Sequence, residues 1–299
     1  MNFDIGEILT RASQITWKHK VLWVFSMFPV LFSFLFVPVV FIPMFFIGPY
    51  SLASQRSIDQ RYYLSLFGNT DLILAILAIL LYVVGTASSS LGILRIENGR
   101  KELAFRELLQ DGLDYFWPVL GVTLLIGGTA SLLLVLVFGC MTVVGFATRG
   151  LGLACLLPLL FFVYPAMLMA YSLLEQSQAA VVVHKVGVRP AISRGWALIR
   201  SRFWDFVRFS LVLYIGMFVL SLVFLLPLLF PFLFLFLVIQ SPQAGSDLQA
   251  LGWPLVGLSL ALLSILALVQ GIAMTFIRSA FMIIYLRLTR STAPQTALQ

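Results

Sequence analysis

Long apolar runs alternate with short polar segments along the chain. Six of the runs are long enough to cross the bilayer, whose hydrocarbon core of about 30 Å takes about 20 helical residues. No segment alternates apolar and polar residues at a period of two over about ten positions, the pattern of a membrane strand. We therefore predict an all-α integral membrane protein with six transmembrane helices. They cover residues 21–47, 72–94, 117–138, 151–174, 209–239 and 253–277, with the last helix continuing to Leu288.

The polar segment before each pair of spans has the pattern of a short amphipathic helix. Apolar residues recur at i, i+4 and i+7, and charged residues occupy the rest of the helical wheel. Such a helix lies in the headgroup plane of a membrane. The predicted apolar stripes are Ile5, Leu9 and Ala12 in the first segment, Phe105, Leu109, Gly112 and Phe116 in the second, and Ile192, Trp196, Ile199 and Phe203 in the third.

These elements form a threefold pattern of one interfacial amphipathic helix followed by a transmembrane hairpin. Trp17, Trp117 and Trp204 lie near the junction with the next span, where aromatic belts form. We predict one polytopic membrane domain over residues 1–299, with repeats at 1–98, 99–178 and 179–290 and a short polar tail at 291–299. No small-residue cleavage site follows the first run, so we expect it to remain as a helix.

Composition agrees with lipid as the main solvent. Of the 299 residues, 61% are hydrophobic and 10% are charged, whereas a soluble domain has about 25% charged residues. The net charge of +7 would suggest nucleic acid in a soluble protein. Here the basic residues cluster beside apolar runs, so they indicate topology and contacts with anionic lipid instead, and we expect no nucleic-acid partner.

The Lys and Arg residues predict the orientation in the membrane. Successive polar segments, from the N-terminus to the C-terminus, carry 3, 2, 4, 1, 6, 0 and 3 of them. Because the richer segments alternate with the poorer ones, the positive-inside rule places both termini in the cytoplasm. We expect a multi-pass protein of the bacterial cytoplasmic (inner) membrane.

The most basic segment is the strongest candidate for an interaction site. Its six cations surround the third amphipathic pattern, and each is expected to attract anionic headgroups of the cytoplasmic leaflet by about 1 kcal/mol. The same charges also set topology, and the two roles are compatible. The predicted headgroup contacts are Lys185, Arg189, Arg194, Arg200, Arg202 and Arg208.

Two charged residues, Glu175 and Arg278, border the predicted spans and are candidates for an intramembrane ion pair. Charged groups at membrane depth often mark transport paths. Near the end of a span, however, a long side chain can also extend to water. A pair between them would tie the fourth span to the sixth.

Prolines and small residues leave further alternatives open. Prolines interrupt three of the predicted spans and either kink the helices for packing or line a solute path. Small residues spaced by four, such as Gly85 with Ser89 and Ser88 with Gly92, favour close helix packing over a polar lining. The prolines are Pro29, Pro38 and Pro43 in the first span, Pro158 and Pro165 in the fourth, and Pro227 and Pro231 in the fifth.

Catalytic and metal-binding patterns are missing from the sequence. The only histidines, His19 and His184, lie beside lysines in basic segments, and a zinc site needs three or four convergent ligands. No phosphate loop, dinucleotide fingerprint or hydrolase motif is present. We expect no enzymatic activity, cofactor or metal.

Two stretches carry a resemblance to a known group of proteins. Residues 190–204 read PAISRGWALIRSRFW, and residues 6–12 and 17–23 read GEILTRA and WKHKVLW. These resemble the A-x-x-R-x-W-x-L-x-x-x-x-F-W signature and the opening of a poorly characterised group of bacterial polytopic proteins. That group includes the membrane domain attached to some glycerophosphodiester phosphodiesterases. The soluble catalytic domain of those enzymes, with its acidic metal ligands and histidines, has no counterpart here, so the resemblance implies no phosphodiesterase activity.

The sequence favours a non-enzymatic membrane scaffold or accessory subunit that contacts anionic lipids. A partner protein or a second copy of the chain is compatible with this role. The competing interpretation is a transporter or permease for a small or amphiphilic solute. A water-filled cavity reaching Arg278 or the Ser88–Ser90 segment would favour transport, and a sealed core would favour the scaffold.

Overall fold

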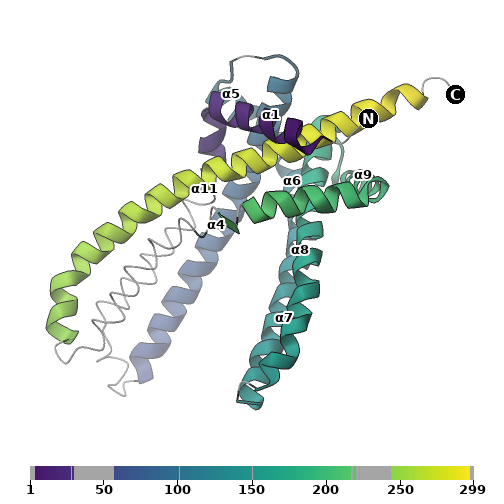
Figure 1. Cartoon of the computed structure of the whole chain (residues 1–299). Helices are drawn as coiled ribbons and strands as arrows, with labels where there is room; N and C mark the ends of the chain where they lie inside the picture. The colour runs from purple at the N-terminus through teal and green to yellow at the C-terminus, as the bar shows by residue number, and fades with distance from the viewer. Residues whose placement is uncertain are drawn as a thin grey trace. The chain divides into compact units, whose positions relative to one another are not determined.

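A computed structural model describes residues 4–27, 29, 57–100, 102–149, 151–216, 218, 219, 222 and 244–296 of this chain. Every regular element among these residues is a helix (Figure 1). The three short helices are α1 (Ile5–Lys18), α5 (Phe105–Leu113) and α9 (Val188–Ser201). The long helices are α4 (Ser57–Glu97), α6 (Phe116–Val122) with η1 (Thr123–Gly127) and α7 (Gly128–Ala147), α8 (Leu151–His184) and α11 (Ala244–Thr296).

Four of the helical segments are long and apolar enough to cross a membrane: Ile73–Glu97, Phe116–Ala147, Phe162–His184 and Ser264–Thr289. They correspond to the predicted spans at 72–94, 117–138, 151–174 and 253–277. The prediction of an all-helical chain with several membrane-spanning helices is thus confirmed. Most of the predicted spans at 21–47 and 209–239 lies outside the described residues, so the number six stays a prediction.

The long helices continue past the predicted ends of the spans. Helix α8 extends to His184 rather than ending near Leu174, and α11 extends through Leu288 to Thr296. Hydropathy ends a span at the first polar residues, but Glu175 and Gln176 are buried against neighbouring helices and the backbone hydrogen bonding continues through them. The predicted repeat boundary at 178/179 therefore falls inside α8.

Proline does not break α8, which contains both Pro158 and Pro165 in continuous helix. A membrane helix tolerates proline because neighbouring groups satisfy the freed carbonyl oxygens. The irregular turn among the described spans is instead the π-helical segment η1, which contains no proline. Pro38, Pro43, Pro227 and Pro231 lie outside the described residues.

The three amphipathic helices form at the predicted places, but their buried faces differ from the predicted stripes. Trp196 of α9 and Phe105 of α5 belong to the predicted stripes and are 51% and 38% exposed, and Phe203, which is 43% exposed, lies beyond the end of α9. Small residues let two helix axes approach closely, and they, rather than the largest side chains, face the neighbouring helices. The buried residues are Ile8, Ala12, Ile15 and Thr16 in α1, Leu108 and Gly112 in α5, and Ala191, Gly195 and Ile199 in α9.

The chain divides into two compact units. The first comprises Met1–Leu22, Thr86–Ile215 and Thr275–Gln299, and the second comprises Trp23–Gly85 and Gly216–Met274. In the first unit, α7 and α8 run side by side and α9 crosses near the C-terminal part of α8 (Figure 1). All residues of the candidate site lie in this first unit.

Candidate functional site

A glycine in each of two short helices seats that helix on a serine of the preceding long helix. A Cβ atom built at Gly112 of α5 would lie 2.3 Å from Ser88 Oγ and 3.1 Å from Ser88 Cα. A Cβ atom at Gly195 of α9 would lie 2.7 Å from Ser177 Oγ and 3.1 Å from the Ser177 backbone nitrogen. No larger residue fits either position without displacing backbone, so these contacts fix how α5 lies on α4 and how α9 lies on α8.

Close packing also explains other small residues of the predicted pairs. Gly92 of α4 lies against Leu22, with 2.7 Å between a built Cβ atom and Leu22 Cδ2. Within the second unit, a Cβ atom at Gly85 would lie 2.3 Å from the carbonyl oxygen of Phe25. Ser88 is fully buried against Gly112. These glycines and this serine serve helix packing, as the sequence favoured.

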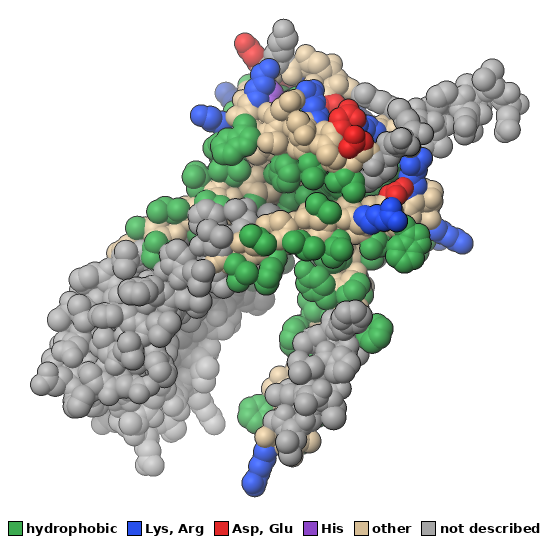
Figure 2. Space-filling view, in the orientation of Figure 1, with side chains coloured by type: hydrophobic (Ala, Val, Ile, Leu, Met, Phe, Trp, Pro, Cys, Tyr) green, Lys and Arg blue, Asp and Glu red, His purple; other side chains and the backbone are tan. Residues whose placement is uncertain are grey.

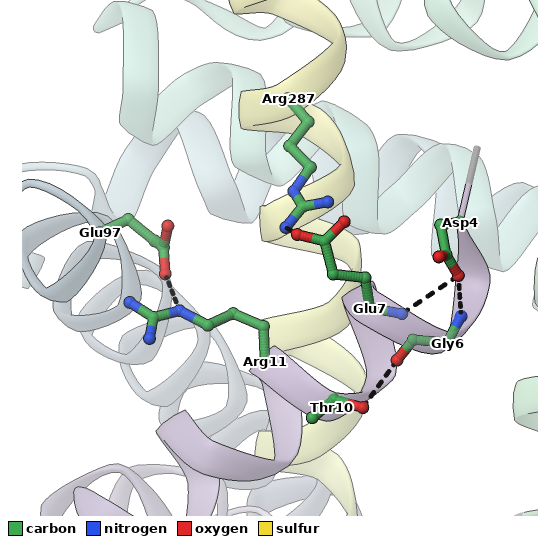
Figure 3. A network of polar contacts seen from close by, with 7 residues as sticks. All are labelled: Asp4, Gly6, Glu7, Thr10, Arg11, Glu97 and Arg287. Atoms are coloured by element: carbon green, nitrogen blue, oxygen red, sulfur yellow. Dashed lines mark hydrogen bonds and ion pairs between the residues drawn. The ribbon is translucent and has the colours of Figure 1, made fainter. Parts of the chain in front are cut away.

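Ion pairs fasten α1 to two long helices (Figure 3). Glu7 accepts from Arg287 Nη2 of α11 at 2.7 Å, and Arg11 Nε donates to Glu97 Oε1 of α4 at 3.0 Å. The hydrogen bond from Arg287, reinforced by its charge, lowers the pKa of the Glu7 carboxyl. Asp4 caps the helix, its Oδ1 accepting from the backbone nitrogens of Gly6 at 2.9 Å and Glu7 at 3.3 Å. The start of α1 is therefore held by both a cap and two cross-helix pairs.

Helix α5 is fastened in the same way. Arg95, near the end of α4, donates to Glu107 at 3.0 Å and pairs with Asp111, and Arg100 also donates to Glu107 at 2.7 Å. Glu107 precedes Gly112 by five residues, as Glu7 precedes Ala12. The sequence placed both glutamates on the polar faces of their helices but did not identify the arginines that pair with them. The equal spacing between each glutamate and its small buried residue could have indicated these pairs.

Three of the predicted headgroup contacts, Arg189, Arg194 and Arg200, lie on α9, and the other three flank this helix in the sequence. Lys185, Arg189, Arg194, Arg200 and Arg208 are exposed. Arg202 is half-buried and pairs with Asp205 at 3.9 Å. Figure 2 shows Lys and Arg side chains beside hydrophobic ones in the region of α9. The arrangement places three exposed arginines and the exposed Trp196 on the same short helix.

Within the first unit, polar side chains of α4, α8 and α11 form a buried layer. Gln176 Nε2 of α8 donates to the carbonyl oxygen of Phe281 in α11 at 3.3 Å. Gln178 Nε2 donates to Thr123 Oγ1 of η1 at 3.0 Å, so the π-helical turn meets this layer. The buried polar residues are Thr86, Ser88, Ser89 and Ser90 of α4, Ser172, Glu175, Gln176, Ser177 and Gln178 of α8, and Thr275, Arg278 and Ser279 of α11.

The two charged members of this layer are Arg278 and Glu175, which are only 2% and 4% exposed. Neither side chain therefore extends to water. That was the alternative to an ion pair that their positions near the span ends had left open. Arg278 Nη1 donates to Ser89 Oγ at 3.2 Å, and the Glu175 carboxyl interacts electrostatically with Arg278 and with the Tyr171 hydroxyl. The structure thus brings both residues into one interior cluster, and a direct ion pair between them stays a prediction.

An open pocket of about 690 Å³ lies between the C-terminal part of α1 and the end of α4. The sequence alone did not predict it, because its two walls are some 80 residues apart along the chain. Burial, and then the charges of Lys18 and Arg11, lower the pKa of His19 in this pocket. The lining residues are Arg11, Gln14, Ile15, Trp17, Lys18, His19, Ile96, Gly99 and Arg100.

Within the described residues, no group of three or more His, Cys, Asp and Glu side chains could hold a metal ion. No protein-family model, no curated protein and no solved structure matches the chain.

Proposed function

We propose that this chain is a non-enzymatic protein of the bacterial cytoplasmic membrane that holds a cationic surface against anionic lipid headgroups. In this role it serves as a scaffold or as the accessory subunit of a larger assembly. The observation that carries the proposal is the geometry of α9, which combines a small-residue face packed on α8, the exposed Trp196 and exposed arginines on one short helix.

The small buried residues, Trp196 and the arginines follow one another round α9. With 3.6 residues per turn, Ile192 and Trp196 lie on the flank beside the buried face, and Arg189 and Arg200 come within about 40° of Trp196. Arg189 and Arg200 lie farther round, away from α8. An interfacial helix needs this arrangement, because one side meets the protein, one meets the acyl chains and one meets the headgroups.

We further propose that the chain has six spans arranged as three repeats, each with one interfacial helix and a hairpin. The equivalent close contacts of Gly112 with Ser88 and of Gly195 with Ser177 support this arrangement. The equally spaced pairs of Glu7 and Glu107 with arginines of long helices support it as well. Helix α9 has Pro190 at the matching position and lacks that carboxylate.

The orientation, with both termini in the cytoplasm, rests on the positive-inside pattern of Lys and Arg. In that orientation α1, α5 and α9 all lie on the cytoplasmic surface, where anionic lipids give a negative surface potential. The kinship with polytopic proteins of the phosphodiesterase-associated group also remains our proposal. Its signature residues in α9 include the buried Ala191 and the exposed Arg194 and Trp196.

The competing proposal, transport, draws on the two charges at membrane depth. A solute path would have to reach Arg278 or Ser89, and these residues are 2% and 0% exposed. The buried layer favours the scaffold, because Gln176, Gln178 and Arg278 bond to neighbouring helices instead of facing water.

Lipid enrichment around the protein tests the proposed function. The protein is extracted into native-membrane nanodiscs, and the lipids and proteins recovered with it are quantified by mass spectrometry. We expect enrichment of anionic lipid around the wild type and its loss in the triple variant Arg189→Gln, Arg194→Gln and Arg200→Gln. A stoichiometric partner protein would support the accessory-subunit role.

The matched control is Arg149→Gln, which removes one cation from the segment between α7 and α8, on the predicted opposite side. It should leave the enrichment unchanged. Equal lipid composition around the wild type and the triple variant would overturn the proposal.

A further inference from the structure

We propose that the pocket between α1 and the end of α4 binds the phosphate-bearing headgroup of one anionic phospholipid. This inference rests on the proposed function, since it requires α1 to lie at the membrane surface. It goes further by assigning a discrete site with one bound lipid, separate from the diffuse cationic face of α9.

The place of the pocket fits a lipid headgroup. Its α4 wall, Ile96 and Gly99, lies where the membrane-spanning segment Ile73–Glu97 ends. Its α1 wall includes Trp17, which is 61% exposed although it is large and apolar. A tryptophan in that position is typical of the boundary between acyl chains and headgroups. The pocket therefore opens at the depth where lipid phosphates lie.

The charge of the lining is positive. Arg11, Lys18 and Arg100 carry full charges, and no carboxylate is among the lining residues. The nearest partners are Glu97, which binds Arg11 Nε, and Glu107, which binds Arg100 Nη1. Each guanidinium has five N–H donors, so these pairs orient the arginines and leave donors for a phosphate. Figure 3 shows the two terminal nitrogens of Arg11 directed away from Glu97.

The neutral form of His19 suits the same ligand. The positive surroundings and partial burial that lower its pKa leave an imidazole that can donate one hydrogen bond without adding further repulsion between cations. An anion in the pocket would offset the positive charges of Lys18 and Arg11 that act on His19. The lining thus offers several donors, and the carboxylates that pair with its arginines, Glu97 and Glu107, are not among the lining residues.

Size and polarity favour a lipid over free phosphate. A volume of about 690 Å³ is far larger than one phosphate ion and falls in the range of about 300–1,000 Å³ that small-molecule sites occupy. Ile15, Ile96 and Trp17 give the pocket an apolar side. A headgroup with the first part of its acyl chains fills both the cationic and the apolar sides.

The test uses the full-length protein, delipidated in detergent and titrated with lipid while native mass spectrometry counts bound molecules. Phosphatidylglycerol is the anionic probe, phosphatidylcholine the zwitterionic one, and inorganic phosphate is added as a competitor. We expect one phosphatidylglycerol to bind at least tenfold more tightly than phosphatidylcholine, and millimolar phosphate not to displace it.

The pocket variant is the pair Lys18→Gln and Arg100→Gln, which leaves the Arg11–Glu97 pair intact. Each cation near a surface contributes about fivefold to the affinity, so the double variant should bind the first phosphatidylglycerol about 30-fold more weakly. The single variant Lys18→Gln changes one exposed side chain and should weaken it about fivefold. It keeps the test decisive if the double variant fails to fold.

The matched control is Arg194→Gln with Arg200→Gln on α9. It should leave the affinity for the first lipid unchanged and reduce only the binding of the weaker, later lipids. If the pocket variants bind the first lipid as tightly as the wild type, the pocket assignment is wrong. If millimolar phosphate displaces the lipid, the site recognises free phosphate and the lipid assignment is wrong. An unchanged binding of later lipids in the α9 control would instead count against the proposed function alone.

Discussion

At the scale of single residues, the smallest side chains determine how the interfacial helices pack. Gly112 and Gly195 bring α5 and α9 against serines of α4 and α8 at distances that exclude even a methyl group. The serine hydroxyls lie at the same contacts and are buried. Because the cationic face of α9 points away from this contact, the glycine indirectly orients the arginines.

Substituting Gly195 by Ala should therefore destabilise the protein. The new Cβ atom would meet Ser177 backbone at 3.1 Å, and overpacking of this kind costs about 1–3 kcal/mol. Thermal unfolding in detergent measures the loss. Gly187→Ala is the matched control, since a Cβ atom there meets nothing within 4 Å, and it should leave the melting temperature unchanged. Equal effects of the two changes would contradict the seating of α9.

The buried charges Glu175 and Arg278 should depend on each other. Removing one leaves the other uncompensated in the interior, which costs about 3–5 kcal/mol for a buried pair. We expect Glu175→Gln and Arg278→Gln each to lower the free energy of unfolding substantially, and the double variant to lose much less than the sum. Unfolding in mixed SDS micelles measures all four proteins. Additive losses would show that the two charges do not interact.

His19 should make stability depend on pH. Its pKa in the folded protein lies below the ordinary value of 6.5, so the folded chain binds fewer protons than the unfolded chain as the pH falls through that value. Stability is then unaffected well above pH 6.5 and declines below it. We expect the melting temperature of the wild type to fall more between pH 7.5 and 5.5 than that of His19→Gln. Parallel curves for the two proteins would refute this role of His19.

At the scale of elements, α1 and α5 are held in the same way. In each helix a glutamate lies five residues before a small buried residue, and this glutamate pairs with an arginine of a long helix. Solvent-exposed pairs contribute little each, about 0–1 kcal/mol. Their effect should therefore appear in local opening of the helix more than in global stability.

Arg95→Gln should loosen α5 selectively. Arg95 pairs with both Glu107 and Asp111, which are one helical turn apart in α5, so its loss removes two contacts at once. We expect faster amide hydrogen exchange in Phe105–Leu113 and unchanged exchange in α1. Arg287→Gln is the counterpart and should accelerate exchange in α1 alone. Uniform acceleration, or none, would contradict independent fastening of the two helices.

The hydrophobic pattern predicted the short helices well but did not identify the face of each helix that packs against protein. A periodicity of three to four residues fixes which residues share a side, and α1, α5 and α9 indeed form where the pattern placed them. It does not tell whether an apolar side meets protein or lipid: Trp196 and Ile199 share one predicted stripe, yet Trp196 is exposed and Ile199 is buried. In a membrane both environments are apolar, and close packing by Gly195 distinguishes them.

Only the part of the candidate site that depends on local sequence could be predicted. Exposed cations such as Arg194 and Arg200 follow from local sequence. The pocket beside Lys18 and Arg100 does not, because it depends on tertiary packing between α1 and α4. The sequence left open whether Arg278 is buried in an ion pair or extends to water, since hydropathy does not decide whether a charge near a span end is solvated.

At the scale of the whole molecule, we propose that three interfacial helices share one cationic membrane surface. Positive residues concentrate in the segments that form α1, α5 and α9, and the connection between α7 and α8 has Arg149 alone. Anionic lipids would meet α9 as a general surface and the α1–α4 pocket as a discrete site. Both depend on α9 and α1 lying in the headgroup plane.

The most direct test is the membrane depth of adjacent positions on α9. Single spin labels are placed at Trp196→Cys and Ala197→Cys, with Cys140 and Cys155 replaced by Ser, in vesicles containing phosphatidylglycerol. Collision with oxygen and with a water-soluble nickel complex reports depth. We predict that the label at 196 meets oxygen and lies among acyl chains, while the label at 197 meets the nickel complex at headgroup level. Equal access of both labels to the nickel complex would show that α9 stands in water, contradicting the proposed lipid-contacting surface.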